Sequence, residues 1–292
     1  MKIQFLLVPY DSGRREWRMG RGPSYLLRHG VGSSIRALGH EVDAEYVEPA
    51  GVDVPNPLAP TEIATSFSLY REVANRARAA SESSALPIIL AGNCGATLGG
   101  VAAAMAAGRG DVGVLWLDAH ADFNTPETTI SGFLDGMALA VLTGRCWRTL
   151  AASIPGFAAI PDANIVLAGA RDLDPAEEML LEESEVRVVS GSSIRTAGLA
   201  ESLAPALQEL RRRVSRLHFH LDADVLDANE ARANAFAAPN GLTIAELRET
   251  ARHVASRFEV VSAAVTAYDP ALDTEGTVPT AIASTLERLL VR

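Results

Sequence analysis

The stretch from Trp116 to Asp135 constrains this chain more than any other. It reads WLDAHADFNTPETTISGFLD and presents Asp118, His120 and Asp122, spaced two apart, directly after the apolar run Val112 to Leu117. A short, apolar and partly β-branched run of this kind predicts a buried strand. Because strand side chains alternate between faces, we expect the two carboxylates and the imidazole to project into one crevice at the strand's carboxyl end.

A second stretch repeats this pattern further along the chain. In LHFHLDADVLD the apolar run Leu217 to Leu221 leads to Asp222 and Asp224. The two stretches together offer four carboxylates and one imidazole, which is more than one divalent ion takes from protein while leaving room for water. We therefore expect two ions bridged by shared carboxylates, and hard oxygen ligands favour Mn²⁺ over zinc. The alternative is that the aspartates cap helices or lie in solvent, but two such motifs in one chain favour a metal cluster.

Strands and helices alternate along the sequence. Strands are predicted at Ile3–Val8, Glu41–Val47, Pro87–Ala91, Val112–Leu117, Asn164–Ala168, Val186–Val189, Leu217–Leu221 and Val260–Ala267, and the predicted helices include Ser24–Leu38, Glu62–Ser81, Glu201–Val214 and Ile244–Phe258. This alternation predicts an α/β fold in which helices cover both faces of a parallel sheet. Ligands of such sheets bind beyond the carboxyl ends of the strands, where both metal motifs are expected.

Composition limits the functions open to the chain. Its 292 residues and 48% hydrophobic content suit one large domain, residues 1–292, with a full core. The net charge of −10 argues against nucleic-acid binding, because no basic stripe is available to neutralise phosphates. The short apolar run at the N-terminus predicts a strand rather than a signal peptide, and no run is long enough to span a membrane. Two cysteines provide no disulfide framework, which is typical of a cytoplasmic protein.

Two segments are predicted to be surface loops. Residues 52–60, VDVPNPLAP, are rich in proline, which disfavours helix and strand. Residues 13–22, GRREWRMGRG, form a basic island. We expect a solvated loop there, and the alternative is an active-site rim that attracts a carboxylate.

Several motifs, taken in order, resemble one enzyme family. LAGNCGATLGG, WLDAHADFNTP, RDLDPAEE and HLDADVLD are similar to motifs of the ureohydrolases, the arginase and agmatinase family of dinuclear manganese hydrolases, and the similarity runs from about Leu90 to Pro270. The resemblance implies a three-layer α/β/α fold with a mostly parallel eight-stranded sheet, and a hydroxide that bridges two Mn²⁺ ions. It also implies a small amino-acid substrate and a homotrimer or hexamer.

The first departure from the family is a cysteine. Family members present a metal-binding histidine within Gly-Gly-Asp-His-Ser, and the matching turn here reads AGNCG, with Cys94 at the histidine position. A nearby dication lowers a thiol pKa, so Cys94 could ligate as thiolate. Thiolate is softer than imidazole, so Mn²⁺ would be held less tightly there and Fe²⁺, Co²⁺ or Zn²⁺ relatively better. In this respect the chain is similar to N-hydroxyarginine hydrolases, and the alternative is a buried, inert cysteine.

The resemblance divides the metal ligands into two overlapping sets, with Asp118 and Asp222 bridging. One ion would be bound by Cys94, Asp118, Asp122 and Asp222, and the other by His120, Asp118, Asp222 and Asp224. Alternation places His220 on the same strand face as Asp222, one step deeper. We expect it to be a packed core histidine or a partner of the ligands, rather than a ligand itself.

The resemblance also indicates residues that would bind the substrate. In arginases an asparagine and a serine after the metal motif hold an α-carboxylate, and an aspartate in RDxD meets the α-amino group. The matching positions are Asn124, Thr129, Ser131 and Asp174, with Glu177 a helical turn on and Thr243 in the place of a pocket threonine. These groups suit a free amino acid better than agmatine. Alternatively, Asn124 and Ser131 are turn residues, and Asp174 and Thr243 are helix N-caps.

Two more departures concern the reacting end of the substrate. Asp135 stands where arginases carry a histidine, and it could carry a proton if its surroundings raise its pKa. Ala267 stands where arginases carry the glutamate that pairs with the guanidinium, with Asp269 and Asp273 nearby as substitutes. A buried guanidinium without a partner is costly, so a less basic group such as an N-hydroxyguanidine is a serious candidate.

We therefore predict a dinuclear manganese amidinohydrolase that cleaves arginine or N-hydroxyarginine to an ornithine-type product and urea or hydroxyurea. Hydroxide from the bridging water would attack the amidine carbon, Asp122 would assist proton transfer to the leaving amine, and Asp135 would be the reserve acid. One alternative is another ureohydrolase substrate, namely agmatine, a guanidino acid or formiminoglutamate. The other is a catalytically silent relative that binds an amino acid.

Overall fold

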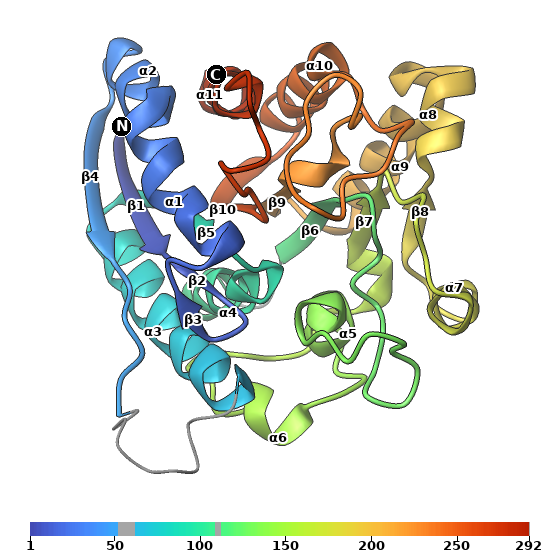
Figure 1. Cartoon of the computed structure of the whole chain (residues 1–292), viewed down its shortest axis with the longest axis horizontal. Coiled ribbons are helices and arrows are strands. Elements are labelled where there is room, and N and C mark those ends of the chain that lie inside the picture. Colours follow the sequence, from blue (N-terminus) through green and yellow to red (C-terminus); the bar gives the residue numbers. More distant parts are fainter. Residues whose placement is uncertain (52–61, 109–111, 292) are drawn as a thin grey trace.

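Eight parallel strands form one sheet through the middle of the molecule (Figure 1). The computed structural model describes residues 1–51, 62–108 and 112–291, so the loop predicted at 52–60 lies outside the described residues. The strands pair in the order β4-β1-β5-β10-β9-β6-β7-β8. Their bounds are β1 (Lys2–Val8), β4 (Glu41–Tyr46), β5 (Ala85–Ala91), β6 (Val112–Leu117), β7 (Ile165–Ala168), β8 (Arg187–Val189), β9 (Arg216–Asp222) and β10 (Glu259–Thr266), and a separate hairpin consists of β2 (Tyr10–Asp11) and β3 (Arg14–Arg15).

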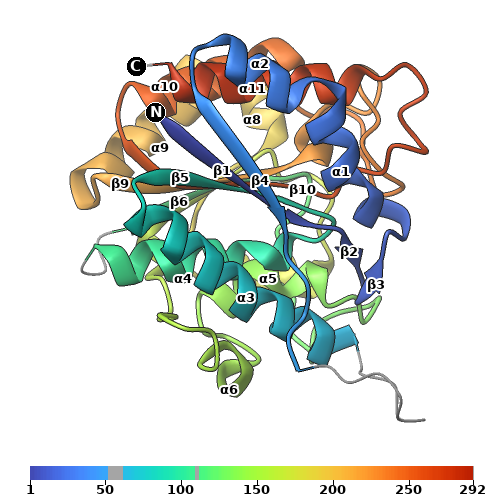
Figure 2. The ribbon, with the colours of Figure 1, turned by 90° about the vertical axis from the view of Figure 1, so that its left-hand side faces the viewer.

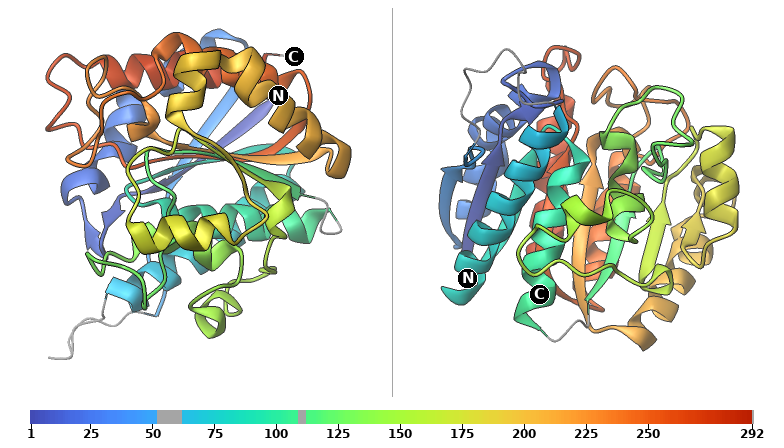
Figure 3. Two further views of the ribbon diagram at one scale, coloured as in Figure 1. Left: turned by 90° about the vertical axis from the view of Figure 1, so that its right-hand side faces the viewer. Right: turned by 90° about the horizontal axis from the view of Figure 1, so that it is seen from below.

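Helices cover both faces of this sheet. In the described ranges they are α1 (Gly22–Leu26), α2 (Gly32–Ala37), α3 (Glu62–Glu82), α4 (Thr97–Ala107), α5 (Ala138–Leu142), α6 (Arg148–Ala151), α7 (Pro175–Glu182), α8 (Gly191–Ala197), α9 (Leu199–Arg213), α10 (Ile244–Ala255) and α11 (Thr277–Leu290). Figure 2 shows α1, α2, α10 and α11 on one face and α3, α4 and α5 on the other, and Figure 3 shows the same layers from the opposite side. The predicted three-layer α/β/α fold is confirmed. None of the helices in these ranges is long and apolar enough to cross a membrane.

The element predictions hold with one clear exception. All eight predicted strands are present, with ends shifted by at most two residues. The single helix predicted at Ser24–Leu38 was wrong, because an irregular turn, Leu27–Val31, separates α1 from α2. Gly30 in this turn has a φ of +125°, a conformation that glycine adopts without a steric penalty. The apolar periodicity continues through the turn, so the pattern alone did not reveal the break.

The middle of the sheet brings the two predicted metal motifs together. Strands β6 and β9 are neighbours, with Trp116 opposite His220 and Leu117 opposite Leu221. All six residues of β6 are buried, as expected for a strand of a parallel sheet that is covered on both faces. The polar residues that follow β6 and β9 therefore emerge side by side at the carboxyl edge of the sheet.

Candidate metal centre and substrate cavity

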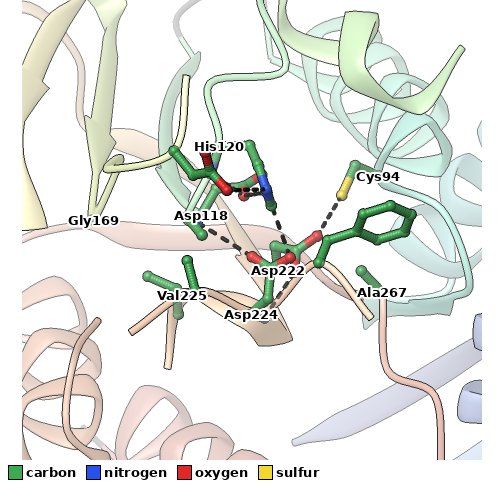
Figure 4. A network of polar contacts seen from close by, with 12 residues as sticks. Cys94, Asp118, His120, Gly169, Asp222, Asp224, Val225 and Ala267 are labelled. Carbon is green, nitrogen blue, oxygen red and sulfur yellow. Dashed lines mark hydrogen bonds and ion pairs between the residues drawn. The ribbon is translucent and has the colours of Figure 1, made fainter. Parts of the chain in front are cut away.

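Cys94 and Asp222 form one side of a buried acidic cluster at this edge (Figure 4). Cys94 begins a short 3₁₀ turn after β5, and Asp222 is the last residue of β9. The Cys94 Sγ donates a hydrogen bond to Asp222 Oδ2 at 2.9 Å and lies 3.1 Å from Thr266 Oγ1. The structure thus places the thiol against a carboxylate that the family resemblance assigns to the same ion.

His120 forms the other side of the cluster. Its Nδ1 lies 3.4 Å from Asp118 Oδ1 and 3.5 Å from Asp224 Oδ2. The backbone N–H of Ala119 donates a hydrogen bond to Asp224 Oδ1 at 3.2 Å. One ligand atom from each of Asp118, His120 and Asp224 lies within 4.8 Å of the other two, so these three residues could hold one metal ion. The motifs after β6 and β9 therefore meet in the fold, while their role as ligands stays a prediction.

The loop after β6, rather than the strand itself, directs these side chains. Strand β6 ends at Leu117, so the alternation assumed from the sequence does not extend to Asp122. Asp122 has a φ of +51°, and this left-handed conformation costs a non-glycine residue about 1–2 kcal/mol. Its carbonyl accepts hydrogen bonds from the backbone N–H groups of Leu139 and Ala140, at 2.9 and 3.1 Å. These bonds anchor the loop to the start of α5 and keep Asp122 beside the cluster.

The cluster carries more negative charge than the described residues neutralise. The four aspartates Asp118, Asp122, Asp222 and Asp224 are all buried, and of the described side chains only His120 forms ion pairs with them. Within the same ranges, Asp122 Oδ2 is buried without a hydrogen-bond partner. Burial, followed by repulsion from neighbouring carboxylates, raises the pKa values of Asp122 and Asp222 well above the ordinary value. Unpaired buried charges are costly, so divalent cations fit this site and would offset that cost.

A cavity of about 520 Å³ adjoins the cluster. This volume is typical of small-molecule sites. On the metal side the cavity is lined by Cys94, His120, Asp122, Asp222 and Asp224. Of the predicted substrate-binding residues, Asn124, Ser131, Asp174 and Glu177 line it, whereas Thr129 and Thr243 are described but are not among its lining residues. The structure therefore brings four of the six to one cavity, and their substrate-binding roles stay predictions.

Asp174 and Glu177 are engaged with the backbone as well as with the cavity. Asp174 is the N-cap residue of α7, and its N–H donates a hydrogen bond to Glu177 Oε2 at 3.2 Å. Glu177 Oε1 accepts a hydrogen bond from Phe123 N at 2.8 Å, which ties α7 to the loop after β6. Asn124 Nδ2 donates to Asp174 Oδ2 at 3.1 Å. Asp174 thus caps a helix, as the alternative interpretation held, and also lies beside Asn124 on the cavity wall.

The remaining hydroxyl groups make local backbone contacts. Thr243 is the N-cap of α10: its Oγ1 accepts a hydrogen bond from Glu246 N at 3.2 Å, and its own N–H donates to Glu246 Oε2 at 2.8 Å. The hydroxyls of Thr129 and Ser131 accept backbone hydrogen bonds within their own turn, at 3.0 and 3.2 Å. Helix capping accounts for the threonine at 243 without a contact to the cavity.

Asp135 lines the cavity beside the Cys94 turn. Its Oδ2 accepts a hydrogen bond from Asn93 Nδ2 and its Oδ1 accepts one from Gly95 N, both at 2.9 Å. Burial raises the pKa of Asp135 to about 7, although these hydrogen bonds act in the opposite direction. A carboxyl group that titrates near neutrality can both donate and accept a proton, which is the property that the sequence interpretation required.

Ala267 lines the cavity at the position where the sequence motifs led us to expect a glutamate. Asp269 accepts a hydrogen bond from the backbone two residues further on, at 3.0 Å. Asp273 accepts hydrogen bonds from the N–H groups of Thr277 and Val278, both at 3.0 Å, and so caps the start of α11. Neither aspartate is among the residues that line the cavity. The described residues therefore give no support to either as a substitute for the glutamate.

Sequence reasoning missed several residues of the cavity wall. Arg18 lines the cavity and makes two hydrogen bonds of 2.9 Å to the buried carboxylate of Asp11. Phe133 and Phe236 stack with ring centroids 5.9 Å apart, and Asn234 Nδ2 donates a hydrogen bond of 3.1 Å to a carboxylate of the cluster. The basic segment of residues 13–22, for which an active-site rim was the alternative interpretation, could have indicated that Arg18 lies at the cavity. The loop that carries Asn234 and Phe236 has no motif that could have revealed their position.

Comparisons with known proteins agree with this geometry. The model of the arginase family matches residues 1–291. The arginase of Brucella melitensis is 32% identical in an alignment that covers 100% of this chain and 96% of the relative. The solved arginase of Bacillus subtilis superimposes with a TM-score of 0.88 at 26% identity, covering 100% of this chain and 99% of that one. The formimidoylglutamase of Bacillus subtilis shares the fold, with a TM-score of 0.76 at 19% identity over 99% of this chain and 85% of that one.

Proposed function

This chain belongs to the arginase family, and on that premise we propose that it is a manganese-dependent amidinohydrolase specific for an arginine-like amino acid with an N-hydroxyguanidine group. Members of this family are hydrolases that act on C–N bonds of linear amidines. The proposed reaction, carried out by one domain of residues 1–292, converts N-hydroxyarginine to ornithine and hydroxyurea.

One observation carries the proposal. The cavity adjoins the acidic cluster and has an alanine at the position where arginases carry the glutamate that pairs with a guanidinium. Ala267 lines the cavity, and its carbonyl oxygen accepts a hydrogen bond from Asn234 Nδ2 at 2.8 Å. A guanidinium buried at this point would lack the usual ion pair and would be costly. A hydroxylated guanidine is less basic, so its neutral form avoids that cost.

The acidic cluster would hold two Mn²⁺ ions, with Fe²⁺, Co²⁺ or Zn²⁺ as alternatives beside the thiol. The proposed ligands are Cys94, Asp118, His120, Asp122, Asp222 and Asp224. When bound, such a pair of ions lowers the pKa of water, so that hydroxide is available at neutral pH.

Asp122 and Asp135 are the proposed proton carriers. Asp122 lines the cavity, and its buried Oδ2 is unpartnered among the described residues, so we propose that this carboxylate takes a proton from the attacking water and passes it to the leaving amine. The pKa of Asp135 is raised to about 7, so this group can supply a second proton at neutral pH. Both groups line the same cavity as five of the proposed metal ligands.

The amino-acid end of the substrate is proposed to lie near Asn124, Ser131 and Asp174. The amide and hydroxyl groups can donate hydrogen bonds to a carboxylate, and the aspartate can accept them from an ammonium group. Glu177 would position this wall through its bond to Phe123 N. Thr129 and Thr243 lie off the cavity lining and are left out of the proposed contacts.

A substrate panel tests the proposal. Protein loaded with Mn²⁺ is assayed with N-hydroxyarginine, arginine, agmatine, guanidinobutyrate and formiminoglutamate, and kcat/KM is compared. We expect N-hydroxyarginine to be the best substrate, and Ala267→Glu to shift the preference toward arginine by roughly tenfold. Efficient hydrolysis of arginine with rejection of N-hydroxyarginine would overturn the proposal.

Two further measurements accompany the panel. A protein that hydrolyses none of these compounds and does not gain Mn²⁺ on incubation would be a silent relative that binds an amino acid. Light scattering tests the homotrimer or hexamer, and fractionation of cells tests the cytoplasmic location, both of which we propose from the family resemblance.

A further inference from the structure

His220 lies on β9, two residues before Asp222, and the family resemblance assigns it no ligand role. Its ring is fully buried, and its Nε2 has no hydrogen-bond partner within the described ranges. A ring nitrogen of His220, the Cys94 Sγ and a carboxylate oxygen of Asp118 all lie within 4.8 Å of one another. An unpaired buried nitrogen costs free energy, and a bound cation would recover that cost.

Two neighbours hold the ring so that Nε2 is the available nitrogen. Thr97 Oγ1 lies 2.7 Å from Nδ1, and when this hydroxyl accepts a hydrogen bond from Nδ1–H, Nε2 carries the lone pair. Trp116 stacks on the ring with centroids 3.6 Å apart, and its own Nε1 donates a hydrogen bond to Asp118 Oδ2 at 3.0 Å. Metal-binding histidines commonly have the second ring nitrogen fixed by an oxygen in this way.

His218 shows that burial by itself does not make a ligand. It lies on the same strand, is also fully buried, and its Nδ1 lies 2.7 Å from Ser262 Oγ. Its Nε2 is likewise unpartnered among the described residues, but no group of metal-binding side chains in those ranges includes it. The distinguishing feature of His220 is its proximity to Cys94 and Asp118.

We propose that His220 is a metal ligand through Nε2 and that, with Cys94 and Asp118, it forms one of the two metal sites. Strand β9, which β10 separates from β5, would thereby supply the imidazole that is lost at position 94. Asp118 belongs to this triad and also to the triad with His120 and Asp224, so it would bridge the two ions. The inference rests on the proposed function only in requiring that the cluster binds metal.

This ligand set makes the two ions chemically different. A thiolate and an imidazole added to the carboxylates proposed for this ion make Zn²⁺, Co²⁺ or Fe²⁺ relatively more favourable there than at a site without the thiolate. The other triad consists of two carboxylates and one imidazole, which suits Mn²⁺ better. The structure thus indicates a mixed pair of sites rather than two equal ones.

Titration of the metal-free protein with CoCl₂ tests the inference, because Co²⁺ absorption bands report thiolate and imidazole ligands. We expect two bound ions and a sulfur-to-cobalt band that Cys94→Ser removes. His220→Phe keeps an aromatic ring against Trp116 but removes the nitrogen. This variant should weaken Co²⁺ binding at the Cys94 site by about tenfold to a hundredfold and change the ligand-field bands. The affinity of the His120 site for Co²⁺ should stay the same.

The matched control is His218→Phe, which makes the same change two residues away on the same strand. We expect it to leave Co²⁺ affinity and the spectrum unchanged, even if it lowers the melting temperature of the metal-free protein. Thr97→Val, which removes only the contact to Nδ1, should weaken binding less than His220→Phe. Equal loss of affinity in the His220 and His218 variants, or wild-type affinity and spectrum in His220→Phe, would overturn the inference.

X-ray absorption of the cobalt-loaded wild-type protein provides a test that needs no variant. The signal averages over both ions, so we expect about half a sulfur neighbour and about one imidazole per cobalt. An average of about half an imidazole per cobalt would refute the role of His220. These readouts are independent of turnover. Metal binding that depends on His220 in a protein that hydrolyses no amidine would refute the proposed function and leave this inference standing. Hydrolysis of an amidine, together with cobalt binding that His220→Phe leaves unchanged, would support the proposed function and refute the role of His220.

Discussion

The acidic cluster, which we propose to bind two metal ions, has two halves that differ in how the chain builds them. His120 lies between Asp118 and Asp224 in loops that follow two strands, and its side chain retains 28% exposure toward the cavity. Cys94 and His220 are almost completely buried, at 2% and 0% exposure, and belong to a turn and to the interior of a strand. The proposed ligands of the His120 half are two carboxylates and an imidazole from recognisable motifs, whereas those of the Cys94 half include a thiolate and an imidazole from separate strands that meet only in the folded chain. This difference supports the proposal that the centre combines two kinds of metal site.

The largest expected effect comes from the residue that the two halves share. Asp118→Asn removes a charged ligand from both triads, so we expect loss of both ions and a decrease in kcat/KM of roughly a thousandfold or more. Metal analysis of the purified protein and the hydroxyurea assay measure these effects. Asp269→Asn removes an acidic group that lies off the cavity and serves as the control. Two bound ions per chain in Asp118→Asn would contradict the idea of a shared bridge.

Removing His120 alone should have a smaller effect. In His120→Asn we expect one Co²⁺ per chain instead of two, with the sulfur-to-cobalt band of the Cys94 half retained. The lost ligand should reduce kcat/KM by roughly a hundredfold. Loss of the sulfur band together with the ion would show that the two halves do not bind metal independently.

Making the two halves alike should change metal preference more than activity. Cys94→His replaces the soft ligand by an imidazole, so the affinity for Mn²⁺ relative to Co²⁺ should rise by roughly tenfold. Competition between the two ions at equilibrium measures this ratio. An unchanged ratio, with the protein folded normally, would indicate that Cys94 is a structural cysteine and not a ligand.

The smallest expected effect concerns His218, the buried histidine outside both halves. Burial lowers its pKa to about 3 from an ordinary value of 6.5, so the folded state binds this proton less readily than the unfolded state. The stability associated with the neutral ring is therefore fully present above pH 6.5 and decreases as the pH falls toward 3. Each pH unit in that window costs at most about 1.4 kcal/mol.

Urea unfolding in chelator at pH 7.5 and pH 5 tests this prediction. His218→Gln should lose less stability between the two pH values than the wild-type protein does. The same loss in both proteins would mean that His218 is already able to take up a proton in the folded state, and the contrast between the two strand histidines would then be weaker.

Several features of the site could be predicted from the sequence because they depend only on the order of residues within short segments. The run Leu217–Leu221 and the aspartates after it predicted a strand end, and Cys94 and Ala267 stood out against the motifs around them. Other features were not. Asp122 takes a left-handed conformation that hydrogen bonds from α5 maintain, and the Asp273 carboxylate turned out to cap α11. A carboxylate near a motif can line the cavity or cap a helix, and only its hydrogen-bond partners in the folded chain show which of the two it does.

By itself, the sequence determined the alternation of strands and helices and the chemistry of the two aspartate motifs, because side-chain periodicity and strand-end residues are properties of short segments. Only the tertiary structure decided that β9 lies between β6 and β10 and that Trp116 stacks on His220. Strand order and cross-strand contacts depend on how distant apolar faces pack together, and no local pattern encodes that packing. For this reason the half with His120 could be predicted, whereas the proximity of the His220 imidazole to Cys94 became visible only in the folded chain.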